Sequence, residues 1–117
     1  METQNAVESL SALAQPTRLE VFRLLASKGE EGIAAGQLAD ALGVPQNTMS
    51  SHLATLARAG LVNSERQSRS IIYRADLAAF RELMLFMLSD CCNGHPEVCA
   101  PVLDQLNATC RPVSDCC

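Results

Sequence analysis

The sequence predicts a mainly α-helical fold with one small β-hairpin, and three observations support this. Apolar residues recur at helical spacing through residues 5–60, and two short segments rich in β-branched residues follow within residues 61–74. The chain has 117 residues, of which 48% are hydrophobic and 19% charged, which suits a single small core. We expect one domain over residues 1–92 and a cysteine-bearing loop and tail over residues 93–117.

Two short helices are expected at the start of the chain. Residues 5–14 form the first, with Val7, Leu10 and Leu13 on one apolar side. The second covers residues 16–26, because Pro16 is tolerated in a first turn, where its missing N–H has no helical partner to lose. Its core-facing residues are expected to be Leu19, Phe22 and Leu25.

A third helix is expected over residues 34–43, closed by Gly43. A fourth helix begins after a short turn through Val44 and Pro45. Two helices joined by a tight, glycine-containing turn form the pattern of a helix-turn-helix, in which the second helix reads DNA.

The fourth helix has an apolar side and an uncharged polar side. Met49, Leu53 and Leu56 recur at helical spacing and should be buried. The opposite side carries short side chains that donate and accept hydrogen bonds, which suits base edges in a major groove better than a solvated face rich in Lys and Glu would. His52 is expected to serve the core or a phosphate rather than a metal. The residues expected to contact DNA from this helix are Gln46, Asn47, Thr48, Ser50, Ser51, His52 and Thr55.

Residues 61–65 and 70–74 are expected to pair as a hairpin whose polar link carries Arg66 and Arg69. Beside a recognition helix, such a wing can place both arginines against phosphates or in a narrow minor groove. The alternative is a solvated hairpin whose arginines have no special role.

The net charge of −4 is unevenly distributed. Residues 46–75 carry 4 Lys or Arg against 1 Asp or Glu, whereas the ratio is 3 to 6 in residues 1–45 and 2 to 6 in residues 76–117. The basic segment coincides with the predicted DNA-reading region, so Arg58 and Arg74 could also meet phosphates. A chance fluctuation of surface charge is the alternative.

The last helix is expected over residues 76–92 and contains an unbroken apolar run at 83–88. A helix that is hydrophobic all round needs burial on more than one side, which a two-fold homodimer would provide. Such a dimer would hold two recognition helices at the spacing of DNA half-sites. The expected interface residues are Leu83, Met84, Phe86 and Met87.

The sequence predicts a cytoplasmic protein without a membrane partner, because no charged leader precedes an apolar run and no run is long enough to span a bilayer. In a reducing compartment, its six cysteines are better explained by metal or redox chemistry than by disulfides.

These features together resemble the ArsR/SmtB family of winged helix-turn-helix metalloregulators. The resemblance covers residues 8–92 and implies a homodimeric repressor that leaves double-stranded operator DNA when an inducing metal or metalloid binds. Pro45 stands where the family usually has Ser, and Ser51 and Ser68 stand where His and Gly are common. The matching residues are Gln15, Pro16, Thr17, Arg18 and Leu19, then Gln46, Thr48, Ser50, His52 and Leu53, and finally Ala59, Gly60, Leu61 and Val62.

Two sensor positions that the family uses lack their ligands here. Members with an arsenic site on the third helix carry cysteines there, whereas residues 33–38 contain none. Members with zinc, cobalt or nickel sites on the last helix use His and carboxylates, whereas residues 77–89 contain no His and only Glu82 as a carboxylate.

Three cysteines after the last helix are the remaining candidate. The Asn-Gly pair at 93–94 can end the helix and Pro96 prevents its continuation, so the chain can bring Cys99 back toward Cys91 and Cys92. Three thiolates match the sulfur pyramid that As(III) or Sb(III) requires as an inducer.

Alternative interpretations remain for the same residues. The thiolates could bind Cd(II) or Pb(II), could bind Zn(II) if His95 or a tail cysteine joined them, or could respond to oxidation. Cys110, Cys116 and Cys117 could form a second thiol site or a metal buffer, or have no fixed role. A thiol-dependent arsenate reductase is a rival of another class. We expect no enzyme, because the chain has neither a phosphate-cradling Gly-rich loop nor a Cys-x-x-Cys motif.

Overall fold

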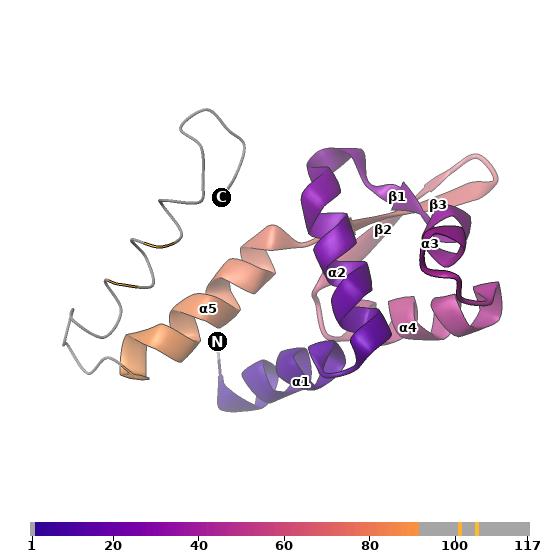
Figure 1. Cartoon of the computed structure of the whole chain (residues 1–117). Coiled ribbons are helices and arrows are strands. Elements are labelled where there is room, and N and C mark those ends of the chain that lie inside the picture. The colour runs from indigo at the N-terminus through magenta and orange to yellow at the C-terminus, as the bar shows by residue number, and fades with distance from the viewer. Residues whose placement is uncertain (1, 92–100, 102–104, 106–117) are drawn as a thin grey trace. The chain divides into compact units, whose positions relative to one another are not determined.

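The structure, a computed structural model, describes residues 2–91, 101 and 105. Residues 1–83 form one compact unit and residues 84–117 a second, whereas the predicted domain boundary after residue 92 lies outside the described residues. The fold is mainly helical with a small antiparallel sheet, which confirms the predicted fold class. In chain order, the elements are α1 (Thr3–Leu13), α2 (Pro16–Lys28), the 3-10 turn η1 (Gly29–Glu31), β1 (Ile33–Ala34), α3 (Ala35–Leu42), α4 (Gln46–Arg58), β2 (Val62–Gln67), β3 (Ser70–Ala75) and α5 (Leu77–Cys91), as Figure 1 shows.

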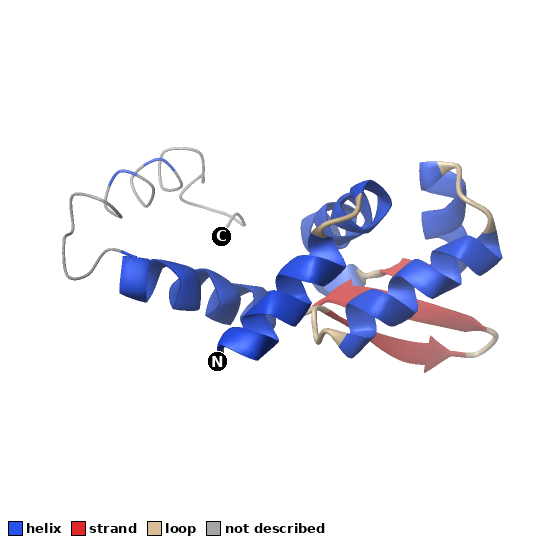
Figure 2. Cartoon of the chain, turned by 90° about the horizontal axis from the view of Figure 1, so that it is seen from below, coloured by secondary structure: helices blue, strands red, loops and turns tan. Residues whose placement is uncertain are grey.

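The predicted hairpin is present as β2 and β3. The strands pair antiparallel, with Ser64 opposite Tyr73, and a two-residue turn at Ser68 and Arg69 joins them. Ser68 adopts a φ of 58°, a left-handed conformation that glycine would adopt at lower cost. α4 runs beside the hairpin and contacts β2 (Figure 2).

A third strand, β1, was not predicted. Ile33 pairs with Tyr73, so β1 covers the other edge of β3 and the strand order is β1-β3-β2. The sequence predicts that Ala34 begins the third helix, which is wrong, because Ala34 ends β1 and α3 begins at Ala35. Gly32 permits the close approach: its φ is 70°, and a Cβ there would lie 2.8 Å from the Tyr73 carbonyl oxygen.

The core of the first unit lies between the helices and the sheet. In α2, Phe22 and Leu25 are buried as predicted, and the Phe22 ring lies 5.2 Å from that of Phe80 at the start of α5. The prediction for Leu19 was wrong, because its side chain is 45% exposed and Val21 is buried instead. The buried core cluster comprises Ala12, Val21, Phe22, Leu25, Ile33, Leu38, Ala39, Met49, Leu53, Leu56, Leu61 and Val62.

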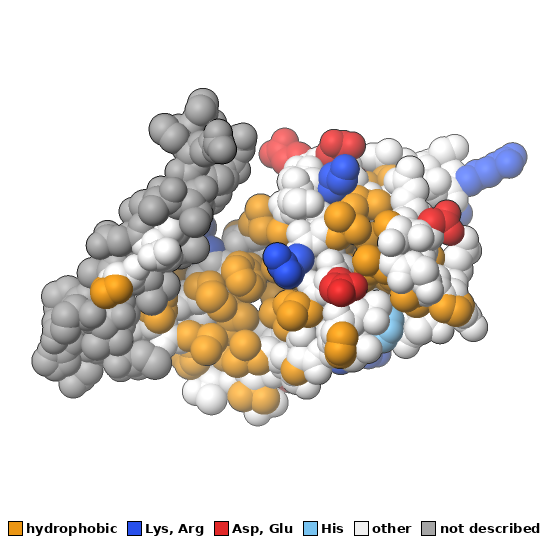
Figure 3. All heavy atoms as spheres, in the orientation of Figure 1, with side chains coloured by type: hydrophobic (Ala, Val, Ile, Leu, Met, Phe, Trp, Pro, Cys, Tyr) orange, Lys and Arg blue, Asp and Glu red, His pale blue; other side chains and the backbone are white. Residues whose placement is uncertain are grey.

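α1 packs on the core through small side chains. Ala6 and Ala12 are buried, together with Ser9, whose hydroxyl reaches the Ala59 carbonyl at 3.5 Å. Val7 is 51% exposed and Leu10 is 39% exposed, so the larger apolar side chains point away from the chain's own core. Figure 3 shows apolar side chains at the surface over α1.

The last helix, α5, is capped at its N-terminus by the side chain of Asp76. Asp76 precedes α5, and its Oδ1 accepts a hydrogen bond from the Ala79 amide at 3.0 Å. Leu83 is fully buried, whereas Leu85 is 61% exposed and Met87 is 39% exposed. Among the residues that the structure describes, no helix has both the length and the apolar character needed to cross a bilayer.

Candidate nucleic-acid interface

α4 separates its side chains by polarity as the sequence predicted. Met49, Leu53 and Leu56 are buried in the core at 0–1% exposure. The polar residues lie on the remaining surface, where Thr55 and His52 are half-buried and the others are exposed: Gln46, Asn47, Thr48, Ser50 and Ser51. The helix therefore rests on an apolar stripe and presents uncharged hydrogen-bonding groups outward.

The turn before α4 fixes where that face points. Gly43 ends α3 in the left-handed conformation, and the Val44 amide donates to the Ala39 carbonyl at 3.0 Å. Pro45 occupies the N-cap of α4 and supplies no side-chain bond. Asn47 compensates in part, because its Oδ1 accepts from the Thr48 amide at 2.9 Å.

The hairpin projects two arginines. Arg66 and Arg69 are exposed, and no carboxylate of the described residues forms a salt bridge with either. Figure 3 shows a basic side chain standing out from the hairpin's end. Both guanidiniums are therefore free to meet an external anion.

Arg74, at the base of the same hairpin, already has two hydrogen-bonding partners within the protein. Its Nη1 lies 2.9 Å from Glu65 Oε1, and its Nε donates to the Glu30 carbonyl at 2.7 Å. These contacts tie β2 and β3 to η1, so Arg74 has a structural role that competes with the predicted phosphate contact.

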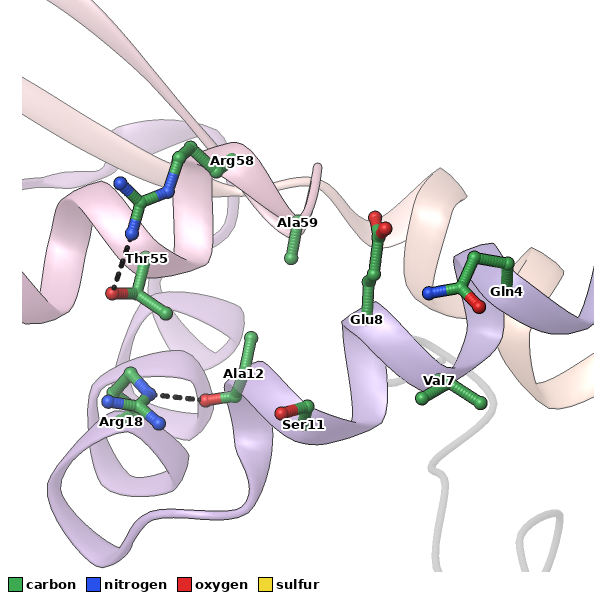
Figure 4. Close-up of a pocket in the computed structure, with 9 residues that line it drawn as sticks. All are labelled: Gln4, Val7, Glu8, Ser11, Ala12, Arg18, Thr55, Arg58 and Ala59. Carbon is green, nitrogen blue, oxygen red and sulfur yellow. Dashed lines mark hydrogen bonds between the residues drawn. The ribbon is translucent and has the colours of Figure 1, made fainter.

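A groove of about 520 Å³ opens between α1, the start of α2 and the C-terminal half of α4 (Figure 4). Arg18 is fixed at its back, since its Nε donates to the Ala12 carbonyl at 2.6 Å and its Nη1 lies 3.5 Å from His52 Nδ1. Arg58, on α4, lies on the same side of the groove as Arg18 and donates to Thr55 Oγ1 at 3.4 Å. The full lining is Gln4, Val7, Glu8, Ser11, Ala12, Arg18, Thr55, Arg58 and Ala59.

Residues 13–65 match a family described as "Helix-turn-helix domain". The repressor SmtB of Mycobacterium tuberculosis is 42% identical over 69 residues, covering 59% of this chain and 49% of that protein. The chain thus spans about half of SmtB's length. The regulator YgaV of Escherichia coli is 33% identical over 70 residues, covering 60% of this chain and 69% of YgaV.

Solved structures agree with this assignment. The homodimeric winged helix-turn-helix DNA-binding domain Mb0332 of Mycobacterium bovis, a possible ArsR-family regulator, matches with a TM-score of 0.62 at 26% identity over 77% of this chain and 82% of that one. The chain belongs to the ArsR/SmtB family of winged helix-turn-helix transcriptional regulators. A further solved structure, described as a "possible transcriptional regulator for arsenical resistance", has a TM-score of 0.62 at 29% identity over 70% of this chain and 82% of its own. Because the relatives are regulators, the prediction that this chain is no enzyme is confirmed.

For this ArsR/SmtB-family chain, the predicted cysteine site lies largely outside the described residues. Cys91 is the last residue of α5, and Cys92 and Cys99 fall beyond the described part. Within residues 2–91, 101 and 105, no group of His, Cys, Asp and Glu forms a three-ligand metal site. As(III) and Sb(III) binding therefore stays a prediction from the sequence.

The predicted dimer residues of this ArsR/SmtB-family chain differ in how far they are exposed. Leu83 is fully buried within the single chain, and its predicted place in a dimer interface stays a prediction. Met84 and Phe86 are half-buried, and Met87 is exposed.

The sequence reasoning did not predict the groove beside α4. The three-residue spacing of Thr55 and Arg58, which places them on one side of the helix, was readable from the sequence.

Proposed function

We propose that this chain is a transcriptional repressor that binds operator DNA as a homodimer and is released when As(III) or Sb(III) binds Cys91, Cys92 and Cys99. The observation that carries the DNA-binding part is the outer face of α4, which is polar, uncharged and backed by buried apolar residues. Repression is supported by the relationship to SmtB, itself a repressor.

The DNA contact is divided between two elements. The exposed amides and hydroxyls of α4 can donate to and accept from base edges, which specifies sequence. Arg66 and Arg69 on the hairpin are exposed cations that can neutralise phosphates, which adds affinity without sequence preference.

Dimerisation is supported by apolar side chains that this chain leaves at its surface. Val7 and Leu10 are 51% and 39% exposed on α1, and Leu85 and Met87 are 61% and 39% exposed on α5. A second copy would remove them from water, each stabilising the dimer by roughly 1 kcal/mol or more. Mb0332, a structural neighbour, is a homodimer.

The sensor assignment depends on chemistry and position in the sequence. Three thiolates suit a trivalent metalloid, and Cys91 terminates the helix on which Met87 is exposed. Binding there can change the end of α5 and, through the dimer, the spacing of the two α4 helices. A coupling of roughly 1–3 kcal/mol would lower operator affinity about 5- to 150-fold.

The test measures fluorescence anisotropy of a labelled duplex taken from the promoter upstream of the chain's own gene. Wild type should bind it as a dimer, and stoichiometric arsenite should release it. Cys91→Ser, Cys92→Ser and Cys99→Ser should each bind the duplex but resist release. The matched control is the full-length Cys110→Ser/Cys116→Ser/Cys117→Ser variant, which should respond like wild type.

Any other result would point to a different sensor or a different function for this chain. If the three single variants still release normally, the sensor is elsewhere. If Cd(II), Pb(II) or Zn(II) releases the duplex and arsenite does not, the inducer is another soft metal. Release by the thiol oxidant diamide alone would indicate a redox sensor, and a duplex that wild type never binds would remove the DNA-binding proposal itself.

A further inference from the structure

The groove between α1 and α4 is lined by two arginines, of which only Arg18 has a short hydrogen bond that holds its guanidinium in place. Arg18 is held by the Ala12 carbonyl at 2.6 Å, so its guanidinium cannot move far. Arg58 is exposed, and its contact to Thr55 Oγ1 is long at 3.4 Å. Figure 4 shows both arginines on the same side of the groove, with Glu8 on α1 opposite Arg58. Arg58 can therefore exchange a weak neutral contact for a strong one to an anion.

Arg58 lies in line with the DNA-facing residues of α4. It follows Asn47 and Ser51 by about three and two helical turns, so the three side chains share the stripe opposite Leu53. Apart from His52, Arg58 is the only ionisable residue in α4. The uncharged face thus ends in a cation that borders the groove.

The groove's composition fits the phosphate of a nucleic-acid backbone. Two guanidiniums face one carboxylate, that of Glu8, and Ser11 supplies an exposed hydroxyl on the α1 side. The planar fork of arginine donates two parallel hydrogen bonds to phosphate oxygens. A duplex lying on the outer face of α4 carries its backbone past the ends of that helix.

We propose that this groove is a phosphate seat, in which Arg58 binds one operator backbone phosphate per protomer while Arg18 provides fixed positive charge behind it. This inference rests on the proposed DNA binding. Because phosphates are the same in every sequence, the seat strengthens binding to any duplex, and Glu8 weakens it by repulsion.

The experiment compares full-length Arg58→Ala with wild type on the promoter duplex and on an unrelated duplex of equal length. Affinity is measured by anisotropy between 50 and 300 mM NaCl. Arg23→Ala is the matched control, because Arg23 is an exposed arginine on α2 that does not line the groove. Arg58→Lys tests whether charge suffices, and circular dichroism checks that each variant is folded.

Arg58→Ala should lower the slope of log affinity against log salt by about one per protomer, and weaken binding of the dimer roughly 30-fold near 0.15 M salt. The loss should be equal on both duplexes, and Arg58→Lys should recover most of the slope. Glu8→Gln should strengthen binding to both duplexes severalfold.

An unchanged salt slope for Arg58→Ala would overturn the seat, and so would an equal loss for Arg23→Ala. A loss confined to the promoter duplex would assign Arg58 to base reading instead. If wild type binds neither duplex, the proposed function fails and not only the seat.

Discussion

The close approach of β1 to β3 predicts a large difference between two glycine substitutions. Gly32 and Gly43 both have a positive φ, 70° and 64°, but their ψ angles are −179° and 36°, so only Gly43 is in the left-handed helical region. An alanine Cβ at Gly43 meets nothing within 4 Å, whereas at Gly32 it would lie 2.7 Å from Ile72 Cγ2 and 2.8 Å from the Tyr73 carbonyl oxygen. Tyr73 is paired on both sides within the sheet, so it cannot move without disturbing two ladders.

The magnitude follows from these contacts. A left-handed conformation costs an alanine roughly 1–2 kcal/mol, partly offset by about 0.4–1 kcal/mol from the restricted unfolded chain. Gly43→Ala should therefore lower the free energy of unfolding by about 1 kcal/mol. At Gly32 the backbone is in a region that is essentially confined to glycine, which costs an alanine roughly 1–3 kcal/mol, and the collision adds roughly 1–3 kcal/mol, for a total of about 2–5 kcal/mol.

Urea unfolding followed by far-ultraviolet circular dichroism measures both variants. All samples need the same protein concentration, because dimerisation couples stability to concentration. Equal losses for the two variants, or a larger loss for Gly43→Ala, would refute the argument that Gly32 is required by its contact with β3.

Other predictions address the hairpin, the core, the reading face and the dimer. Ser68→Gly should raise the free energy of unfolding by up to about 1 kcal/mol in the same assay, because it relieves a φ of 58°; a loss would contradict this. Leu53→Ala should cost roughly 2–5 kcal/mol, since Leu53 is completely buried, and a cost below about 1 kcal/mol would place it outside the core. Gln46→Ala should weaken promoter binding by roughly 1–3 kcal/mol and spare an unrelated duplex in anisotropy, because Gln46 is an exposed amide on the outer face of α4; equal effects would exclude base reading. Val7→Glu should shift sedimentation equilibrium toward monomer, whereas Asn5→Glu, at another exposed position of α1, should not; an unaffected dimer would remove Val7 from the interface.

The sequence predicted α4 well because only a helix places all of its large apolar residues on one side. Met49, Leu53 and Leu56 share one helical stripe, and no other secondary structure would bury all three together. β1 could not be found in this way, since a two-residue strand has no periodicity and its place depends on pairing with β3.

Periodicity also does not say which neighbour covers an apolar stripe. On α1 the sequence places Val7 and Leu10 on one apolar side, and the structure buries the small residues Ala6 and Ala12 while Val7 and Leu10 stay exposed. Small side chains let the helix approach α2 and α4 closely, and the large ones stay exposed, where the proposed second copy would cover them. Arg74 shows the same limit for charge, because its partners Glu65 and the Glu30 carbonyl meet it only in the folded structure.

The coupling between metalloid and DNA is tested most directly by titrating arsenite into the free protein and into the protein saturated with promoter duplex. Because linkage is reciprocal, arsenite should bind the DNA-bound dimer more weakly, by the same factor by which arsenite weakens DNA binding. Equal arsenite affinity for the free and the DNA-bound protein would contradict the account.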